Sequence, residues 1–236
     1  MNLAMMEEGF RKAKKILKVC NLFYIENYTR TLMFKPSKFS SDFFEASKDM
    51  DHNGDYRKLY QVAITNKDYD ILLEDYSFFQ FSCESNSNNE VKYRYAYYEV
   101  PSEFPTYEEF LNENSFSYMD CGEGFRQDYE QVIDEAKLKN AVTPVRYDYD
   151  ESLHEPPVHS TSHLHLGFQN EIRIPSKYLL TPHAFVAFIV RHIYWRRWKT
   201  LMNDNKFCSI YYVKGECHYL NKTLFTSDEE KDFYIT

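Results

Sequence analysis

Glycine is scarce in this sequence, with 6 residues in 236. Loops that bind phosphate through backbone amides need closely spaced glycines, so the scarcity disfavours nucleotide-binding folds built on such loops. Basic residues are also in deficit, since the formal net charge is −8. A protein that coats nucleic acid non-specifically needs clustered Lys and Arg. The composition therefore excludes that class and leaves only a local basic cleft.

Paired cysteines and long apolar segments are missing as well. The five cysteines are widely spaced and form no CxxC pair, which is typical of free thiols in a reducing compartment. Charged residues interrupt every apolar run in residues 1–23, and no run reaches the roughly 20 residues of a membrane span. We therefore expect a cytoplasmic protein without a signal peptide and without a membrane partner.

Aromatic residues are abundant, with 21 Tyr and 19 Phe, and they occur in strand-like runs. Tyrosine and phenylalanine favour strands when turn residues separate the runs. The sequence predicts an antiparallel meander between residues 56 and 100, three later strands, and a hairpin that turns at Lys214 and Gly215. The predicted strands are RKLYQVAIT, YDILLE, SFFQFSC, VKYRYAYYEV, VTPVRYDYD, HLHLG and EIRIP, and the hairpin is SIYYVKGECHYL.

Helical spacing of apolar residues, together with capping residues, predicts four main helices. Their expected ranges are 3–23, PTYEEFLNE with Thr106 as N-cap, roughly 124–140, and 181–202 with Thr181 as N-cap and Pro182 at the first helical position. A short helix is expected at SDEEKDF. No polar linker divides the chain. We predict a single α+β domain over residues 1–236, with an N-terminal helix at 3–23, then an antiparallel sheet and flanking helices over 30–236, including a long helix in the C-terminal half.

Residues 146–175, RYDYDESLHEPPVHSTSHLHLGFQNEIRIP, contain four of the eight histidines. Because successive side chains of a strand point to opposite faces, Arg146 shares a face with Asp148, and His163 shares one with His165. His154 and His159 stand beside prolines and are expected in a loop.

A hairpin between HLHLG and EIRIP has one apolar and one polar face only if its loop is odd in length. An odd loop around Gly167 to Asn170 places His165 opposite Glu171 and His163 opposite Arg173. We therefore predict an odd loop.

The resulting polar cluster suits phosphodiester cleavage without a metal. A neutral histidine takes a proton, a protonated partner gives one, and arginine binds the phosphate. The predicted catalytic residues are His163, His165, Arg146, Asp148 and Arg173. The predicted substrate-binding residues are His159, His183 at a helix N-terminus, and Arg191 and Trp195, which stand in RHIYWRRWK and suit stacking on RNA.

Two other interpretations of the histidine block remain open. A divalent metal bound by His163, His165 and Asp148 would make the protein a metal-dependent hydrolase. The spacing after HxH fits neither the cupin nor the JAMM metalloprotease pattern, and arginines nearby oppose a cation. Alternatively, the block is a surface hairpin, and the chain is a non-catalytic interaction subunit. No cofactor is predicted under the main hypothesis.

The elements RYDYD, HEP, SHLHLG, RIP and PHAFVAFIVRHIYW resemble a bacterial domain-of-unknown-function family from about residue 50 onward. Residues 146–165 also resemble toxins of the TumE type from toxin–antitoxin pairs, with Arg146, Asp148, His163 and His165 at the matching positions. The second resemblance implies a nuclease of a toxin or phage-defence system. Its expected partners are an RNA substrate and a protein, either an antitoxin or a defence-system subunit.

Overall fold

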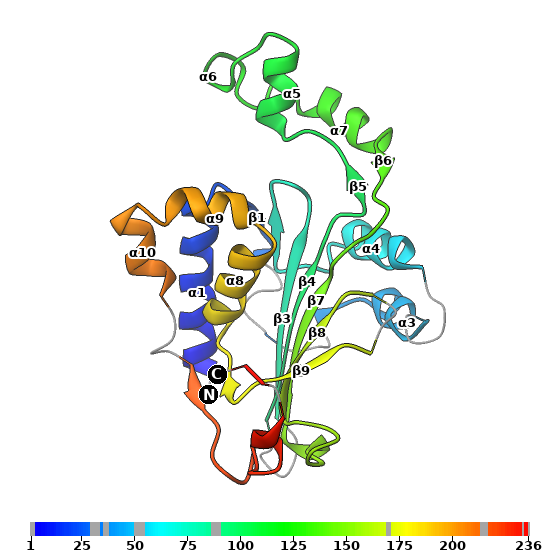
Figure 1. Cartoon of the computed structure of the whole chain (residues 1–236). Coiled ribbons are helices and arrows are strands. Elements are labelled where there is room, and N and C mark those ends of the chain that lie inside the picture. Colours follow the sequence, from blue (N-terminus) through cyan, green and yellow to red (C-terminus); the bar gives the residue numbers. More distant parts are fainter. Residues whose placement is uncertain are drawn as a thin grey trace.

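The computed structural model describes residues 3–28, 34, 38–49, 55–85, 91–168, 171–212, 217–232 and 234–235. Its centre is a seven-stranded antiparallel sheet in the order β1-β2-β3-β4-β7-β8-β9 (Figure 1). The strands are β1 (Phe23–Glu26), β2 (Ile71–Leu73), β3 (Phe78–Ser85), β4 (Val91–Tyr98), β7 (Val145–Asp150), β8 (Ser162–Leu166) and β9 (Arg173–Pro175).

Helices and two small strand pairs surround this sheet, so the predicted α+β class is confirmed. The strand pairs are β5 (Ser102–Glu103) with β6 (Lys137–Leu138), and β10 (Tyr178–Leu179) with β11 (His218–Tyr219). The helices are α1 (Leu3–Val19), α3 (Ser41–Asp49), α4 (Tyr56–Thr65), α5 (Tyr107–Glu113), α6 (Tyr118–Cys121), α7 (Arg126–Asp134), α8 (Pro182–His192), α9 (Trp195–Leu201) and α10 (Asn205–Tyr211), with 3-10 turns η3 (Glu151–Leu153) and η4 (Glu229–Lys231).

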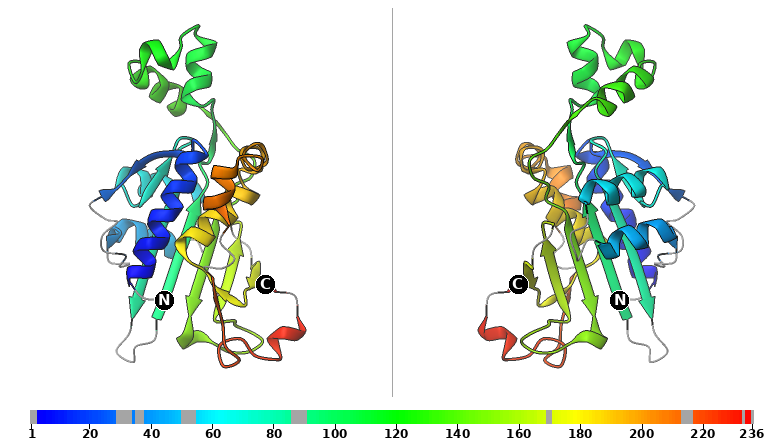
Figure 2. Two further views of the ribbon diagram at one scale, coloured as in Figure 1. Left: turned by 90° about the vertical axis from the view of Figure 1, so that its left-hand side faces the viewer. Right: turned by 90° about the vertical axis from the view of Figure 1, so that its right-hand side faces the viewer.

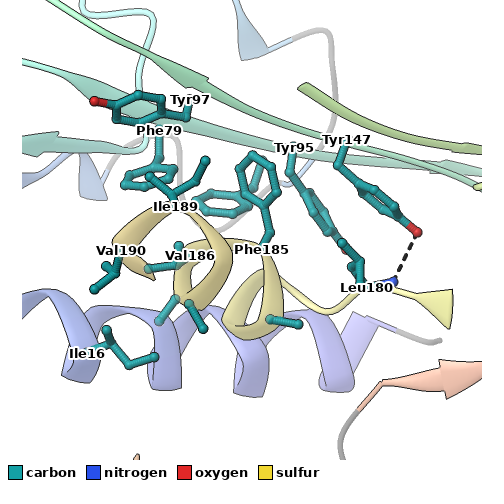
Figure 3. Packing of buried hydrophobic residues seen from close by; sticks show 14 of the residues in the cluster. Ile16, Phe79, Tyr95, Tyr97, Tyr147, Leu180, Phe185, Val186, Ile189 and Val190 are labelled. Carbon is teal, nitrogen blue, oxygen red and sulfur yellow. Dashed lines mark hydrogen bonds between the residues drawn. The ribbon is translucent and has the colours of Figure 1, made fainter. Parts of the chain in front are cut away.

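One face of the sheet is covered by α8, with α1 packed behind it (Figure 3). The ring of Phe185 on α8 lies 5.8 Å from that of Tyr95 on β4, and the Tyr95 and Tyr147 rings stack at 5.4 Å. The Tyr147 hydroxyl accepts a hydrogen bond from the Leu180 amide at 3.0 Å. Because tyrosines alternate with polar residues along β4 and β7, burying the rings on this face turns the polar residues to the other face.

Helices α3 and α4 pack on the opposite face over the β2 to β4 region (Figure 2). Their contact includes Leu59 and Ala63 of α4 with Phe78 of β3. The polar side of β7, β8 and β9 continues this face beyond the two helices.

Residues 104–136, which we call the arm, project from one end of the sheet and contain α5, α6 and α7 (Figures 1 and 2). The β5 and β6 pair joins the arm to the sheet. Tyr107, Leu111 and Tyr129 form a small buried cluster of its own. Thr106 caps α5 in a capping box with Glu109, which confirms its predicted role as N-cap.

Several predicted elements differ from the structure. RKLYQVAIT is α4 and not a strand, because Asp55 caps it and Tyr56, Leu59 and Ala63 bury one helical face. The N-terminal helix ends at Val19, and Phe23 begins β1.

The C-terminal half shows the other differences. The long helix over 181–202 is two helices, α8 and α9, interrupted at Ile193 and Tyr194. The Tyr194 hydroxyl donates to Asp75 at 2.8 Å, which anchors the interruption to the turn between β2 and β3. The predicted hairpin is wrong, since SIY ends α10 and HY forms β11 beside β10. Its predicted turn lies outside the described residues.

Candidate functional site

The polar face of β7 and β8 carries the predicted histidine cluster. In the antiparallel register Arg146 stands opposite His165, and Asp148 stands opposite His163. Val145, Tyr147 and Tyr149 are buried on the other face. The alternation predicted from VRYDYD and HLHL is therefore confirmed.

The loop of the β8 to β9 hairpin has an odd length, as predicted, but the two strands pair in a different register. Leu166 donates to the carbonyl of Ile172 at 3.4 Å, which leaves residues 167–171 as an odd loop, of which 169–170 lie outside the described residues. His165 stands opposite Arg173, and His163 opposite Pro175. The predicted pairs, His165 with Glu171 and His163 with Arg173, are wrong by two residues. Because the shift is even, the shared face of His163, His165 and Arg173 is kept.

Asp148 is the centre of the cluster. Its Oδ2 accepts from Arg146 Nε at 2.8 Å, and its Oδ1 accepts from Arg94 Nε at 3.0 Å. Burial alone would raise the pKa of Asp148, but the hydrogen bond from His165 and the charges of Arg146 and Arg94 hold it well below its usual range. Asp148 is therefore a carboxylate at neutral pH and fixes both guanidinium groups.

His165 lies between Asp148 and Arg146. Its Nε2 is 3.3 Å from Asp148 Oδ2 and 3.1 Å from Arg146 Nη2. Burial lowers the pKa of His165, and the arginine charges lower it further, although Asp148 opposes them. Two neighbours of this nitrogen accept a hydrogen bond, the Asp148 carboxylate and, at 3.0 Å, the His163 Nε2, so we assign the proton to His165 Nε2. Arg146 Nη2, which can only donate, is then a close contact and not a hydrogen bond.

His163 is buried and has a defined tautomer. Its Nδ1 lies 2.9 Å from the Ser160 carbonyl, and a carbonyl only accepts, so Nδ1 carries the proton and Nε2 has a free lone pair. That Nε2 lies 3.0 Å from His165 Nε2. Burial, and then the neighbouring His165, lower the pKa of His163 to about 4. His163 is a neutral imidazole at neutral pH.

His159 comes from the loop between β7 and β8. Paired backbone hydrogen bonds of 2.9 and 2.7 Å between Glu155 and His159 close this loop. The His159 ring lies 4.9 Å from the His163 ring in an edge arrangement. Its Nδ1 is buried and has no hydrogen-bond partner within the described ranges. A buried nitrogen without a partner costs free energy, which favours a ligand at this position.

A pocket of about 340 Å³ opens beside this histidine. Apolar side chains form part of its wall, and His159, His163, Arg173 and Asp232 contribute polar groups. The lining residues are Pro157, Val158, His159, Ser160, His163, Arg173, Ile174, Pro175 and Asp232.

Three of the predicted substrate-binding residues lie elsewhere. His183 is buried and donates from Nε2 to the Ile210 carbonyl at 2.7 Å. Arg191 lies 3.9 Å from the Trp198 ring, and Trp195 stacks on Trp198 at 4.9 Å. These residues belong to α8 and α9, on the sheet face opposite Arg146, so they do not join the histidine cluster.

Two residues of the cluster were not predicted from the sequence. Arg94 alternates with the tyrosines of VKYRYAYY, so the sequence could have placed it on the polar face. Its contact with Asp148 could not be predicted, because it depends on the pairing of β4 with β7. Ser160 acts through its backbone carbonyl, which no side-chain pattern reveals.

Asp148, His163 and His165 also form a group with metal-ligand chemistry, since one ligand atom from each lies within 4.8 Å of the others. The Ser160 carbonyl orients His163 as a second ligand shell would. This group could form a site, and Arg146 is the residue that opposes a cation there.

Comparisons with known proteins add a family but no activity. The family model described as "Uncharacterized conserved protein (DUF2290)" matches residues 22–236. Neither the curated proteins nor the solved structures gave a match. Within the described ranges we also find no helix with the length and hydrophobicity that a membrane span requires.

Proposed function

Because the chain belongs to the uncharacterised conserved family DUF2290, whose description names no activity, we propose a function from the site alone. The site binds a phosphodiester and cleaves RNA without a metal ion. The observation that carries the proposal is the position of Arg146. Its guanidinium group lies 2.8 Å from Asp148 Oδ2 and 3.1 Å from His165 Nε2, so a fixed positive charge stands against two atoms that a metal would need.

The charge of the cluster favours an anion. The three arginines of the site, Arg94, Arg146 and Arg173, outnumber the carboxylates beside them, which are Asp148 in the cluster and Asp232 in the pocket lining. The two central histidines are neutral at pH 7. Arg94 keeps 65% of its side chain exposed while its Nε is bound to Asp148. Its remaining N–H groups can therefore reach a phosphate, for which the guanidinium fork is well suited.

The two histidines act on one substrate oxygen. Nitrogen atoms 3.0 Å apart cannot stand on opposite sides of a phosphorus atom, as an in-line acid and base must. They can both contact a single hydroxyl: when it binds, the His165 Nε2–H, which donates to Asp148 in the free protein, donates instead to the hydroxyl oxygen. The hydroxyl proton then points to the lone pair of His163 Nε2. This changes the sequence-based hypothesis, in which the pair supplied both the acid and the base.

The reaction that follows is transesterification. His163 takes the 2′-hydroxyl proton, the 2′-oxygen forms a bond to phosphorus, and the bond from phosphorus to the 5′-oxygen breaks. His159, which lines the same pocket, gives a proton to the leaving oxygen. A bound phosphodiester anion raises the pKa of His163 toward neutrality. RNA is favoured over DNA because its 2′-hydroxyl supplies the nucleophile without metal activation.

The direct test is cleavage of a single-stranded RNA in EDTA by the purified protein. We expect the wild type to cleave this RNA and the His165→Asn variant to lose cleavage while it keeps its fold. Expression of the wild type, and not of this variant, should arrest growth, as the toxin-like resemblance implies. Absence of RNA cleavage by the wild type under all metal conditions would overturn the proposal.

A metal-dependent hydrolase is the second candidate, favoured by the convergence of Asp148, His163 and His165. In that case the two Nε2 atoms and the carboxylate would hold a divalent cation, which would activate a water molecule. Metal analysis separates the two candidates. A stoichiometric transition metal that is lost in His163→Asn, with activity lost in EDTA, would replace the metal-free proposal.

A further inference from the structure

The arm carries the net negative charge of the whole protein. Residues 104–136 contain nine acidic residues and one basic residue, Arg126, a net charge of −8. The full chain also has a net charge of −8, so the remainder is neutral. Such segregation of charge creates a strong local field at the arm, whereas the histidine face has an excess of arginine.

The end of the arm exposes apolar side chains within this acidic surface. Met119 is 92% exposed, Tyr118 46% and Phe116 40%, and we call these three residues the tip. The Phe116 ring is stacked on Phe125 at 4.4 Å, so it is held in place while part of it faces solvent. Exposed apolar groups inside a charged rim are typical of protein-binding surfaces.

The arm is held firmly against the sheet at its base. The Arg126 guanidinium lies over the ring of Tyr107 in the arm at 4.1 Å and over that of Tyr24 in β1 at 4.8 Å. It also forms an ion pair with Glu74, next to β2, at 3.5 Å. A surface presented on a fixed support loses little conformational entropy on binding. Figure 1 shows that α6, the helix that contains Tyr118 and Met119, stands clear of the sheet.

We propose that the tip docks into an apolar pocket on a basic partner protein. The acidic rim repels phosphate, which excludes nucleic acid as the occupant, and attracts Lys and Arg side chains around such a pocket. Met119 is the anchor, since its flexible thioether side chain adapts to an apolar pocket. Exposed carboxylates at Glu108, Glu113 and Asp120 provide the steering charge. The surface is separate from the histidine cluster, so the inference does not depend on the proposed RNA cleavage.

The test uses the full chain with Met119→p-benzoylphenylalanine, expressed in its native host cells and irradiated. The matched control is Tyr219→p-benzoylphenylalanine, an exposed position on β11. We expect a covalent adduct with one basic protein at position 119 and not at 219. That protein is then identified, purified and titrated with the unmodified full chain.

Three results of the titration are expected. Met119→Asp should weaken binding by roughly tenfold or more, as for an interface anchor. Glu113→Lys combined with Asp120→Lys should weaken binding and reduce its salt dependence. Arg196→Glu, an exposed charge reversal on α9, should leave the affinity unchanged. All three variants should retain any RNA cleavage of the wild type.

Four outcomes would overturn the proposal. They are no specific adduct at position 119, an adduct with a second copy of this chain, an adduct with nucleic acid, and binding of the captured protein that Met119→Asp does not weaken.

Discussion

The Nε2 atoms of His163 and His165 face each other at 3.0 Å, with the lone pair on His163 and the proton on His165. Ser160 fixes the first tautomer and Asp148 the second. Two nitrogens so arranged can accept from and donate to the same oxygen. In the proposed mechanism His163 is therefore the base, and His165 orients the attacking hydroxyl.

Replacing either histidine should remove RNA cleavage while keeping the fold. We expect His163→Asn to reduce kcat by about 10² to 10⁴-fold, the usual contribution of a general base. His165→Asn should have a similar effect because the hydroxyl loses its donor. Initial rates on a fluorescent single-stranded RNA measure both, with circular dichroism to check the fold. His218→Asn, an exposed histidine on β11, is the control, and an equal loss there would contradict the assignment.

Stability should fall as the pH drops from about 6.5 to 4. The folded-state pKa of His163 is lowered to about 4, whereas an unfolded histidine has a pKa of about 6.5. Above pH 6.5 neither state binds the proton. Below it the unfolded state binds more protons, so the free energy of unfolding decreases by up to about 3 kcal/mol. Asp148, whose pKa is lowered, adds a further loss that begins as the pH falls to the ordinary aspartate pKa of about 3.9 and continues below it.

Urea titrations at a series of pH values measure this dependence. His163→Asn should reduce the slope between pH 6.5 and 4, where His165, whose pKa is also lowered, keeps part of the dependence, and should leave the loss at lower pH. An unchanged slope in that variant would mean that His163 is not buried as a neutral imidazole.

Arg94 should contribute to binding of the phosphate. It is largely exposed and is fixed by Asp148. Arg94→Ala should raise KM by about tenfold, in the range of a lost charge-assisted hydrogen bond, and should reduce the dependence of KM on salt. Steady-state kinetics at two ionic strengths provide the measurement. Arg196→Ala, on the other face of the sheet, should change neither quantity.

Trp195 should have no part in cleavage, although its place in RHIYWRRWK suggested RNA stacking. It is stacked on Trp198 at 4.9 Å, on the face opposite the histidine cluster. We expect Trp195→Ala to keep kcat/KM within about twofold of the wild type, because no site group loses a contact. A tenfold loss of cleavage with an intact fold would show that RNA crosses to α9.

The parts of the site that follow from strand alternation were predictable. The spacing of Arg146 and Asp148, and of His163 and His165, determines their faces once each segment is a strand. The register of β8 with β9 was not determined, because loops of three and five residues keep the same faces. As a result, His165 pairs with Arg173 and not with Glu171, the residue predicted.

Contacts between segments distant in the chain could not be predicted from the sequence. Arg94 reaches Asp148 only because β4 pairs with β7. The position of α9, on the sheet face opposite the histidine cluster, follows from the packing of α8. The α4 segment was mistaken for a strand because its β-branched and aromatic residues outweighed the helical spacing of Tyr56, Leu59 and Ala63.

The most direct test of the central claim uses a single-stranded RNA in EDTA, with a matched RNA that has one 2′-deoxy residue at the cleavage position. We predict a 2′,3′-cyclic phosphate and a 5′-hydroxyl from the first RNA, identified by mass spectrometry, and no cut at the deoxy position of the second. Cleavage at the deoxy position, or cleavage only when a divalent metal is added, would contradict it.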